Sequence, residues 1–477
     1  MKLKINFVIK IVLLLYVSNS IFPQNNYTNT VNEIEHHLTN SFFNSTTIAV
    51  DAYDLTAEKI VFKKNEKLLL HPASNQKIIT SAAGLLFLGD DYKFNTSLYH
   101  TGEIVDSICM GDIFIVGGCD PDFSLNDLDS LVCALKENGI NKILGNIYGD
   151  VSYLDSLYWG KGWMWDDDPY SDFPRLTPLT INDVCVKFIV KPGKNGELVE
   201  ITLEPQSEFY SFANSAITSG IDSSTFDIER DWLNGNNIFR AVGELSITEE
   251  VDTLLRNVVH PEKYFLTLFK ENLEKHGIEF SGVIDTLTLP EKHKHLFTLS
   301  RKYSQIVNNL NKESDNLSAE MTLRALAHEY CGKPASADSG IVLIDSLITL
   351  IGLDPTKYRI VDGSGVSHYN LVSTELVNEL LKYFYYNEKA LYETLYESFP
   401  IAGVDGSLKK RMNSGLAYNN VHAKTGTLSG VSTLSGYLNT KNGHLISFSI
   451  FIQNYVEKDK EARAYIDELC EILCNID

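Results

Sequence analysis

Three short segments of this 477-residue chain carry residues that could perform acyl transfer together. The first is Ser74-Asn75-Gln76-Lys77, which places a hydroxyl and an amine three residues apart. The other two are Ser314-Asp315-Asn316 and Lys424-Thr425-Gly426. Each segment alone is common, since a serine often caps a helix and a lysine can lie on any surface. In this order and combination they predict a serine nucleophile that a lysine, rather than a histidine, activates.

The expected setting of the first segment suits that role. Apolar residues between Ile78 and Leu86 recur at spacings of three and four, which predicts a buried helix that starts near Ser74 and ends at Gly89. The N-terminus of a helix favours developing negative charge. Lys77 shares a helical face with Ser74, and burial lowers the proton affinity of an amine, as a lysine base requires.

The other two segments supply complementary groups. Ser314 and Asn316 fall between helical patterns, and we expect an inter-helix loop with a hydroxyl for proton relay and an amide that faces Lys77. Lys424 begins a strand-like run, where it could hold a carboxylate, and Gly426 would let a substrate backbone approach closely. The plainer interpretations are a helix cap for Ser314-Asp315-Asn316 and a surface turn for the segment that begins at Lys424. Each is plausible for its segment alone, but it is implausible that all the segments have only such plain roles.

Strand patterns lie at both ends of the chain. Residues 47–53 and 59–62 predict a hairpin near the N-terminus. Near the C-terminus, 433–438 and 444–453 flank Asn442-Gly443, a dipeptide favoured in tight hairpin turns. We therefore expect one antiparallel sheet built from both ends of the chain, with helices packed on it.

Helical periodicity dominates 303–328, and short strands and turns dominate 92–289. The sequence thus predicts an α+β multidomain protein. The length suggests two or three domains, and the region 92–289 is a long insertion between the two ends of the chain.

Residues 1–24 are typical of a secretory signal, because Lys2, Lys4 and Lys10 precede a short apolar stretch. That stretch is too short to span a membrane comfortably, so we expect export and no transmembrane segment in the mature chain. The formal net charge of −21 argues against a nucleic-acid partner, which needs clustered Lys and Arg.

No metal and no organic cofactor are expected. His293 and His295 lie in a charged turn whose lysines would repel a cation. The seven cysteines show no metal-ligand spacing, and a Cys109–Cys119 bridge is left open. 

Trp159, Trp163 and Trp165 stand beside a run of aspartates, from Asp166 to Asp168. They could line a groove that contacts glycan or pack one domain on another, and we favour packing.

The chain resembles the type-4, low-molecular-mass class C penicillin-binding proteins, the D-alanyl-D-alanine carboxypeptidase/endopeptidases of bacterial cell-wall metabolism. Further segments carry this resemblance over nearly the whole mature chain: His71-Pro72-Ala73-Ser74, Gly117-Gly118-Cys119-Asp120-Pro121, Val361-Asp362-Gly363-Ser364-Gly365, Phe399-Pro400-Ile401-Ala402-Gly403-Val404-Asp405-Gly406 and Lys424-Thr425-Gly426-Thr427-Leu428-Ser429-Gly430. The family often has a third glycine where Cys119 stands.

The resemblance implies a penicillin-binding-protein/β-lactamase-like transpeptidase domain, interrupted between the first and second motifs by inserted domains. The split catalytic domain would then comprise 25–91 and 290–477, and the β-rich region 92–289 would form two nested smaller domains. It implies that Ser74 is the nucleophile and Lys77 the general base for acylation. Ser314 and Asn316 would complete the proton network.

The resemblance also implies the groups that hold the substrate. Lys424 and Thr425 would bind its terminal carboxylate, with Gly426 and Thr427 beside them. The backbone N–H groups of Ser74 and Thr427 would form the oxyanion hole.

The function expected on these grounds is an exported, periplasmic serine DD-peptidase. It would cleave after D-alanine in peptidoglycan stem peptides, through an acyl-enzyme on Ser74, and β-lactam antibiotics would inhibit it covalently. A serine β-lactamase shares the motifs but does not need the insertion 92–289. A non-catalytic cell-wall binding protein would have no need for a matched nucleophile and base.

Overall fold

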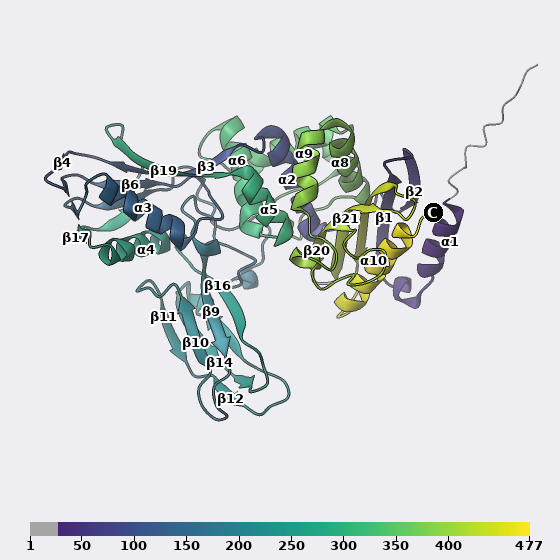
Figure 1. Cartoon of the computed structure of the whole chain (residues 1–477), viewed down its shortest axis with the longest axis horizontal. Helices are drawn as coiled ribbons and strands as arrows, with labels where there is room; N and C mark the ends of the chain where they lie inside the picture. The colour runs from purple at the N-terminus through teal and green to yellow at the C-terminus, as the bar shows by residue number, and fades with distance from the viewer. Residues whose placement is uncertain (1–26) are drawn as a thin grey trace, which may run out of the picture.

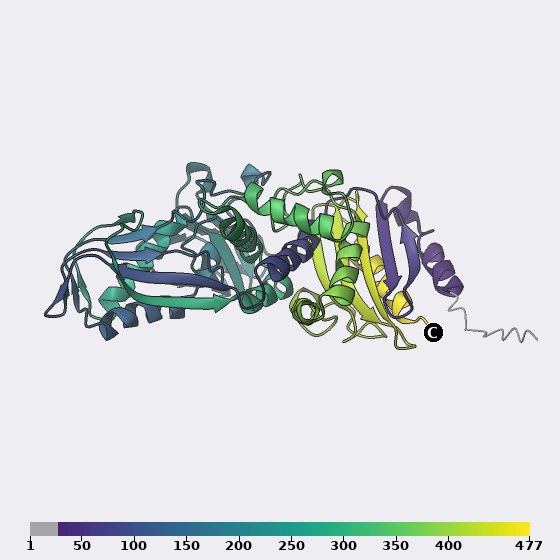
Figure 2. The same cartoon turned by 90° about the horizontal axis from the view of Figure 1, so that it is seen from above.

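The computed structural model describes residues 27–477, so the predicted signal at 1–24 lies outside the described residues. Figures 1 and 2 show an elongated molecule, with the two ends of the chain gathered in one sheet-and-helix body and the middle of the chain in a separate set of sheets. Within residues 27–477, no helix is both long and apolar enough to cross a membrane.

A five-stranded antiparallel sheet forms the centre of the body that contains both chain ends (Figure 1). Its strand order is β2-β1-β22-β21-β20. The strands are β1 (Thr47–Asp54), β2 (Lys59–Lys64), β20 (His422–Leu428), β21 (Val431–Asn439) and β22 (Leu445–Gln453). The predicted antiparallel sheet from both ends of the chain is therefore confirmed, and β20 lies at its edge.

Helices cover both faces of this sheet. One face packs against α1 (Thr28–His37) and α10 (Asp459–Cys474), which contact each other. Alternate residues of β22 face that side, because Ile446, Phe448, Ile450 and Ile452 belong to the same apolar cluster as residues of α10. On the other face lie α2 (Gln76–Phe87), α5 (Tyr303–Lys312), α6 (Asn316–Cys331), α7 (Ala337–Leu350), α8 (Thr374–Asn387) and α9 (Lys389–Ser398).

Helix α2 is the centre of this second helical layer. Its residues from Gln76 to Leu85 are all buried, and it contacts α5, α6 and α7. Gly84 is required there, because a Cβ at this position would lie 2.2 Å from the hydroxyl oxygen of Tyr303. The predicted buried helix is confirmed, and its close contact with α5 and α6 brings the first two motifs together.

The inserted residues form a mixed sheet of order β18-β8-β6-β3-β19, with α3 (Leu125–Glu137) and α4 (Pro261–Lys275) packed against it (Figures 1 and 2). Its strands are β3 (Lys93–His100), β6 (Ile113–Val116), β8 (Ile147–Asp150), β18 (Ile284–Thr286) and β19 (Lys294–Lys302). A smaller sheet adjoins it, made of β4 (Ile104–Val105), β5 (Ile108–Cys109), β7 (Lys142–Ile143) and β17 (Glu279–Phe280).

A third group of strands lies, in sequence, between β8 and α4, and it projects from the rest of the molecule in Figure 1. It contains β9 (Cys185–Lys191), β10 (Glu200–Glu204), β11 (Ser211–Asn214), β12 (Ile217–Ser219), β13 (Asp227–Arg230), β14 (Ile238–Val242), β15 (Glu244–Ser246) and β16 (Asp252–Asn257). We propose that this group is the inner of two nested domains. We also propose that the outer one ends at Lys302 rather than at 289, because β19 pairs with β3.

Within residues 27–477 all seven cysteines are free thiols. The Cys109–Cys119 bridge that the sequence left open is therefore not formed.

Candidate active site

Ser74 lies in a single 3-10 turn, η2 (Ala73–Asn75), that leads directly into α2. The sequence predicted that the helix itself begins near Ser74, whereas α2 begins at Gln76. The difference arises at Ala73, whose φ of +47° is left-handed. Gly365 packs against this residue so closely that a Cβ there would lie 1.9 Å from the Ala73 carbonyl oxygen. Strain of this kind beside a reactive side chain is common at functional sites.

Lys77 is fully buried and contacts three oxygen atoms. Its Nζ lies 3.0 Å from Ser74 Oγ, 2.5 Å from Asn316 Oδ1 and 2.9 Å from the Ser364 carbonyl oxygen. Burial lowers the pKa of Lys77 to about 8, against the opposing effect of nearby carboxylates, chiefly that of Asp315. An amine with this pKa is partly neutral near neutral pH.

The three contacts define how a neutral Lys77 would be oriented. Asn316 Oδ1 and the Ser364 carbonyl oxygen can only accept hydrogen bonds, so they take the two N–H groups of the neutral amine. The lone pair on Nζ then faces Ser74 Oγ, whose hydroxyl can donate. This is the arrangement that a base needs in order to remove the serine proton.

Lys424 supplies a second buried amine, on the edge strand β20. Its Nζ donates to Ser314 Oγ at 2.8 Å and to the Thr425 carbonyl oxygen at 2.9 Å. Burial, and then repulsion from Lys77, hold the pKa of Lys424 well below its usual value. A carboxylate that entered the site would favour the charged form of Lys424 and would raise its pKa again.

The β20 backbone lies against the turn that carries Ser74. Asn75 Nδ2 donates to the Lys424 carbonyl oxygen at 2.9 Å, and Asn75 is itself fully buried. A Cβ on Gly426 would lie 2.9 Å from the backbone nitrogen of Ser74, so only glycine permits this approach. On either side of Gly426 in the sequence, Thr425 is half-buried and Thr427 is exposed.

Asp315 and Ser314 place the middle motif. Asp315 caps α6 by accepting from the backbone N–H groups of Leu317 and Ser318, which fixes Asn316 in the first turn of that helix. Ser314, in the loop before it, has a φ of +63°. The inter-helix loop predicted from the sequence is confirmed, between α5 and α6. All three motifs thus meet at one point.

Two buried carboxylates, to which the sequence analysis assigned no role, support this site. Glu320 Oε1 accepts from the backbone N–H groups of Gly363 and Ser364 and from Ser364 Oγ, and its other oxygen pairs with Arg324. It therefore fixes the carbonyl group that faces Lys77. Its position, one helical turn after Asn316 and one turn before Arg324, was the signal that could have identified it.

Asp362 is the second of these carboxylates. It accepts hydrogen bonds from the backbone N–H groups of Gly365 and Ser367, from Asn370 Nδ2 and from Trp163 Nε1. These contacts hold the loop that presses against Ala73.

Residues 158–176, here called the bridging segment, connect the inserted region to the site. The carbonyl oxygen of Asp172 accepts from Asn316 Nδ2 at 2.5 Å, so the other end of that amide faces Lys77. Trp163 Nε1 donates to Asp362 Oδ2 at 3.0 Å. The bridging segment thus contacts both the middle motif and the loop behind Ser74.

The three tryptophans of the bridging segment have different settings. Trp159 and Trp163 pack edge to face with ring centroids 5.3 Å apart, and Trp163 is buried. Trp165 is 70% exposed and lies against Trp232 of the third strand group, with centroids 4.9 Å apart. Packing accounts for the first two, as expected.

Comparisons with known proteins show to which family the chain belongs. Residues 30–475 match the sequence model of the D-Ala-D-Ala carboxypeptidase 3 (S13) family. The chain is 30% identical over 416 residues to D-alanyl-D-alanine carboxypeptidase DacB of Haemophilus influenzae, which covers 86% of each chain. It is 31% identical over 411 residues to a D-alanyl-D-alanine carboxypeptidase of Actinomadura sp., covering 83% of this chain and 75% of that one.

Solved structures are similar over nearly the whole chain. The crystal structure of penicillin binding protein 4 from H. influenzae superposes with a TM-score of 0.80 at 28% identity, covering 92% of this chain and 97% of the other. The same protein complexed with a β-lactam gives a TM-score of 0.74 at 26% identity, covering 92% and 98%. The predicted α+β multidomain fold and the resemblance seen in the sequence are confirmed. The chain belongs to the D-Ala-D-Ala carboxypeptidase 3 (S13) family of serine peptidases.

Proposed function

We propose that this chain is an exported, periplasmic DD-peptidase that cleaves the peptide bond after D-alanine in peptidoglycan stem peptides. It releases either a terminal D-alanine or the partner strand of a cross-link. One observation carries the proposal: in a chain of this family, a buried amine whose pKa is lowered to about 8 lies 3.0 Å from Ser74 Oγ. The peptidoglycan substrate is supported by the family and by the names of its relatives.

The reaction begins with proton transfer from Ser74 to Lys77. Ser74 Oγ then attacks the carbonyl carbon after D-alanine, and the tetrahedral oxyanion is held by the backbone N–H groups of Ser74 and Thr427. When the C–N bond breaks, the leaving amine takes a proton from the Lys77 ammonium, with Ser314 as the relay. Water then hydrolyses the ester on Ser74, which restores the hydroxyl and releases the new carboxylate.

Lys424 gives this site its preference for a substrate that ends in a carboxylate. Its Nζ already contacts Ser314 Oγ and the Thr425 carbonyl oxygen, and the third N–H of the ammonium is left for the substrate. The backbone of the edge strand β20, from Thr425 to Thr427, can pair with the extended stem peptide as an added strand.

The first experiment is intact-mass analysis after incubation with penicillin. We expect one covalent adduct in the parent chain and none in Ser74→Ala. Ser346→Ala, which removes an exposed hydroxyl on α7, should form the adduct as the parent does. The absence of an adduct in the parent, or its persistence in Ser74→Ala, would disprove the proposal.

Defined muropeptides then separate the alternatives. A DD-peptidase releases D-alanine from monomers or splits cross-linked dimers, and its penicillin adduct decays slowly. Rapid turnover of penicillin would instead indicate a β-lactamase, and binding of peptidoglycan without any release would indicate a non-catalytic binding protein.

A further inference from the structure

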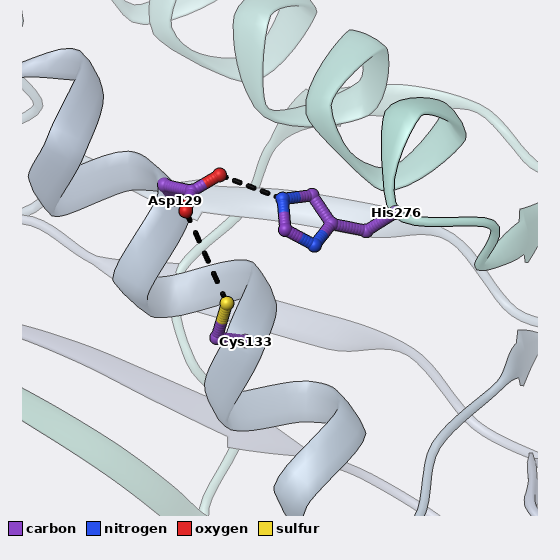
Figure 3. A group of neighbouring side chains, drawn as sticks. All are labelled: Asp129, Cys133 and His276. Atoms are coloured by element: carbon purple, nitrogen blue, oxygen red, sulfur yellow. Dashed lines mark hydrogen bonds and ion pairs between the residues drawn. The ribbon is translucent and has the colours of Figure 1, made fainter.

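Three potential metal ligands lie together beside α3 and α4 of the outer domain (Figure 3). Asp129 and Cys133 are one turn apart on α3, and His276 directly follows α4. His276 Nε2 lies 2.6 Å from Asp129 Oδ1, and Cys133 Sγ lies 4.0 Å from Asp129 Oδ2. One ligand atom from each residue can be chosen so that all three lie within 4.8 Å of one another.

The ligand types indicate which ion would bind. Thiolate and imidazole favour Zn²⁺ over Mg²⁺ or Ca²⁺, which prefer oxygen ligands throughout. Three protein ligands leave the fourth tetrahedral position for water. That position is open to solvent, because the Asp129 and His276 side chains are 51% and 25% exposed.

We propose that Asp129, Cys133 and His276 bind a Zn²⁺ ion that links α3 to α4. The ligands come from regular, well-anchored positions. A capping box at Ser124 fixes the start of α3, and the backbone N–H of His276 donates to the Asn272 carbonyl oxygen at the end of α4. Binding requires side-chain rotations that place the three ligand atoms, now within 4.8 Å of one another, around one centre.

Binding follows a simple proton balance. Cys133 coordinates as the thiolate and releases its proton to solvent, and His276 coordinates through the lone pair of the neutral Nε2. Asp129 exchanges its hydrogen bond with His276 for a bond to the ion. No electron is transferred, and the zinc stays Zn²⁺.

The consequence is a cross-link between two helices that pack on the same sheet. Helices α3 and α4 contact each other, and they cover the sheet that contains β8 and β19. Because Asp129, Cys133 and His276 share no contact with Ser74 or Lys77, the ion should stabilise the outer domain and leave acylation unchanged. The zinc proposal is therefore independent of the proposed function. If the chain binds no zinc, the proposed peptidase activity is unaffected.

The test uses the untagged, full-length mature chain. Affinity for Zn²⁺ is measured by competition with a chromophoric chelator, and Co²⁺ substitution reports the ligands by its visible bands and its thiolate-to-cobalt charge transfer. The variants are Cys133→Ser and His276→Gln. Cys331→Ser is the matched control, since Cys331 is an exposed thiol outside the cluster.

We expect one Zn²⁺ per chain, a tetrahedral Co²⁺ spectrum with a thiolate band, and a higher melting temperature with Zn²⁺ than with chelator. Each cluster variant should weaken binding by more than about tenfold, because even the outer-sphere partners of a metal site contribute that much. Cys331→Ser should match the parent in every measurement. A parent that binds no Zn²⁺, or a thiolate band and affinity unchanged in Cys133→Ser, would overturn the proposal.

Discussion

In the proposed mechanism Lys77 is the residue whose environment matters most, because full burial and nearby carboxylates act on its pKa in opposite directions. Burial disfavours its charge, whereas the carboxylates of Asp315 and Asp362 favour it. The balance leaves the pKa at about 8, where both the base and its conjugate acid are accessible in one catalytic cycle.

The substitution Lys77→Arg tests whether acylation requires a neutral amine at this position or only a positive charge. Arginine keeps the positive charge but stays protonated at any accessible pH. We expect the rate of penicillin acylation to fall by at least about a hundredfold, the usual contribution of a general base. Timed intact-mass measurements check this, with Lys382→Arg on α8 as the control outside the site. A rate within a few fold of the parent would rule out Lys77 as the base.

The pH dependence of acylation follows from the same pKa. In the proposed mechanism the neutral amine is the active form, so the rate should rise with pH and level off above about 8. Below the pKa, each unit of pH removes about nine-tenths of the remaining neutral form. Acylation rates measured between about pH 6 and pH 9 test this, and the slope should vanish in Lys77→Arg. A parent rate that is independent of pH, or that falls as pH rises, would contradict the assignment.

At the scale of elements, α2, α6 and β20 meet because each carries a local signal that the sequence reveals. The apolar spacing of α2, the cap at Asp315 and the β-hairpin of the C-terminal strands were all visible in residue types. They sufficed to predict one antiparallel sheet from both chain ends and a loop around Ser314.

Other parts of the site could not be predicted from residue types. Ser364 and Asp172 act through backbone carbonyl groups, which every residue has. The left-handed turn at Ala73 depends on a contact with Gly365, nearly 300 residues later in the chain. Similarly, Cys133 and His276 approach each other only because α3 packs on α4.

The bridging segment is an element whose contribution can be measured. Trp163→Phe keeps an aromatic ring against Trp159 and Phe173 but removes the donor to Asp362. A lost hydrogen bond to a carboxylate costs about 1.5–3 kcal/mol, so we expect lower thermal stability and acylation slowed by about tenfold. Because the base is untouched, the pH at which acylation levels off should not move.

Trp165→Phe is the matched control for this effect, because Trp165 is exposed and contacts Trp232 instead. It should acylate at the parent rate. If both variants behaved alike, the bridging segment would have no positioning role through Asp362.

At the scale of the whole molecule, the third strand group is joined to the rest by adjacent strands. Lys187 of β9 and Leu255 of β16 are register partners, so the entry and exit of the group lie side by side. Ends that meet in this way are typical of inserted domains.

Excision of this group tests the nested-domain proposal. Replacing 188–254 by Asn-Gly would close Lys187 and Leu255 into a two-residue hairpin. Asp168 would lose Arg230 but keep Arg175, so the bridging segment should remain in place. We expect a chain that unfolds cooperatively and still forms a penicillin adduct on Ser74. Circular dichroism during heating and intact-mass analysis check this, and an aggregated chain would show that the group is needed for folding.

The position of β22 has a consequence for when the enzyme becomes active. This strand separates β1, which precedes Ser74, from β21, which leads back to Lys424 on β20. Until it inserts, β1 and the β20–β21 hairpin are not joined within one sheet. In sequence order the nucleophile therefore comes long before the strand that completes this sheet, and we expect the acylation site to assemble only after β22 has paired with both of its neighbours.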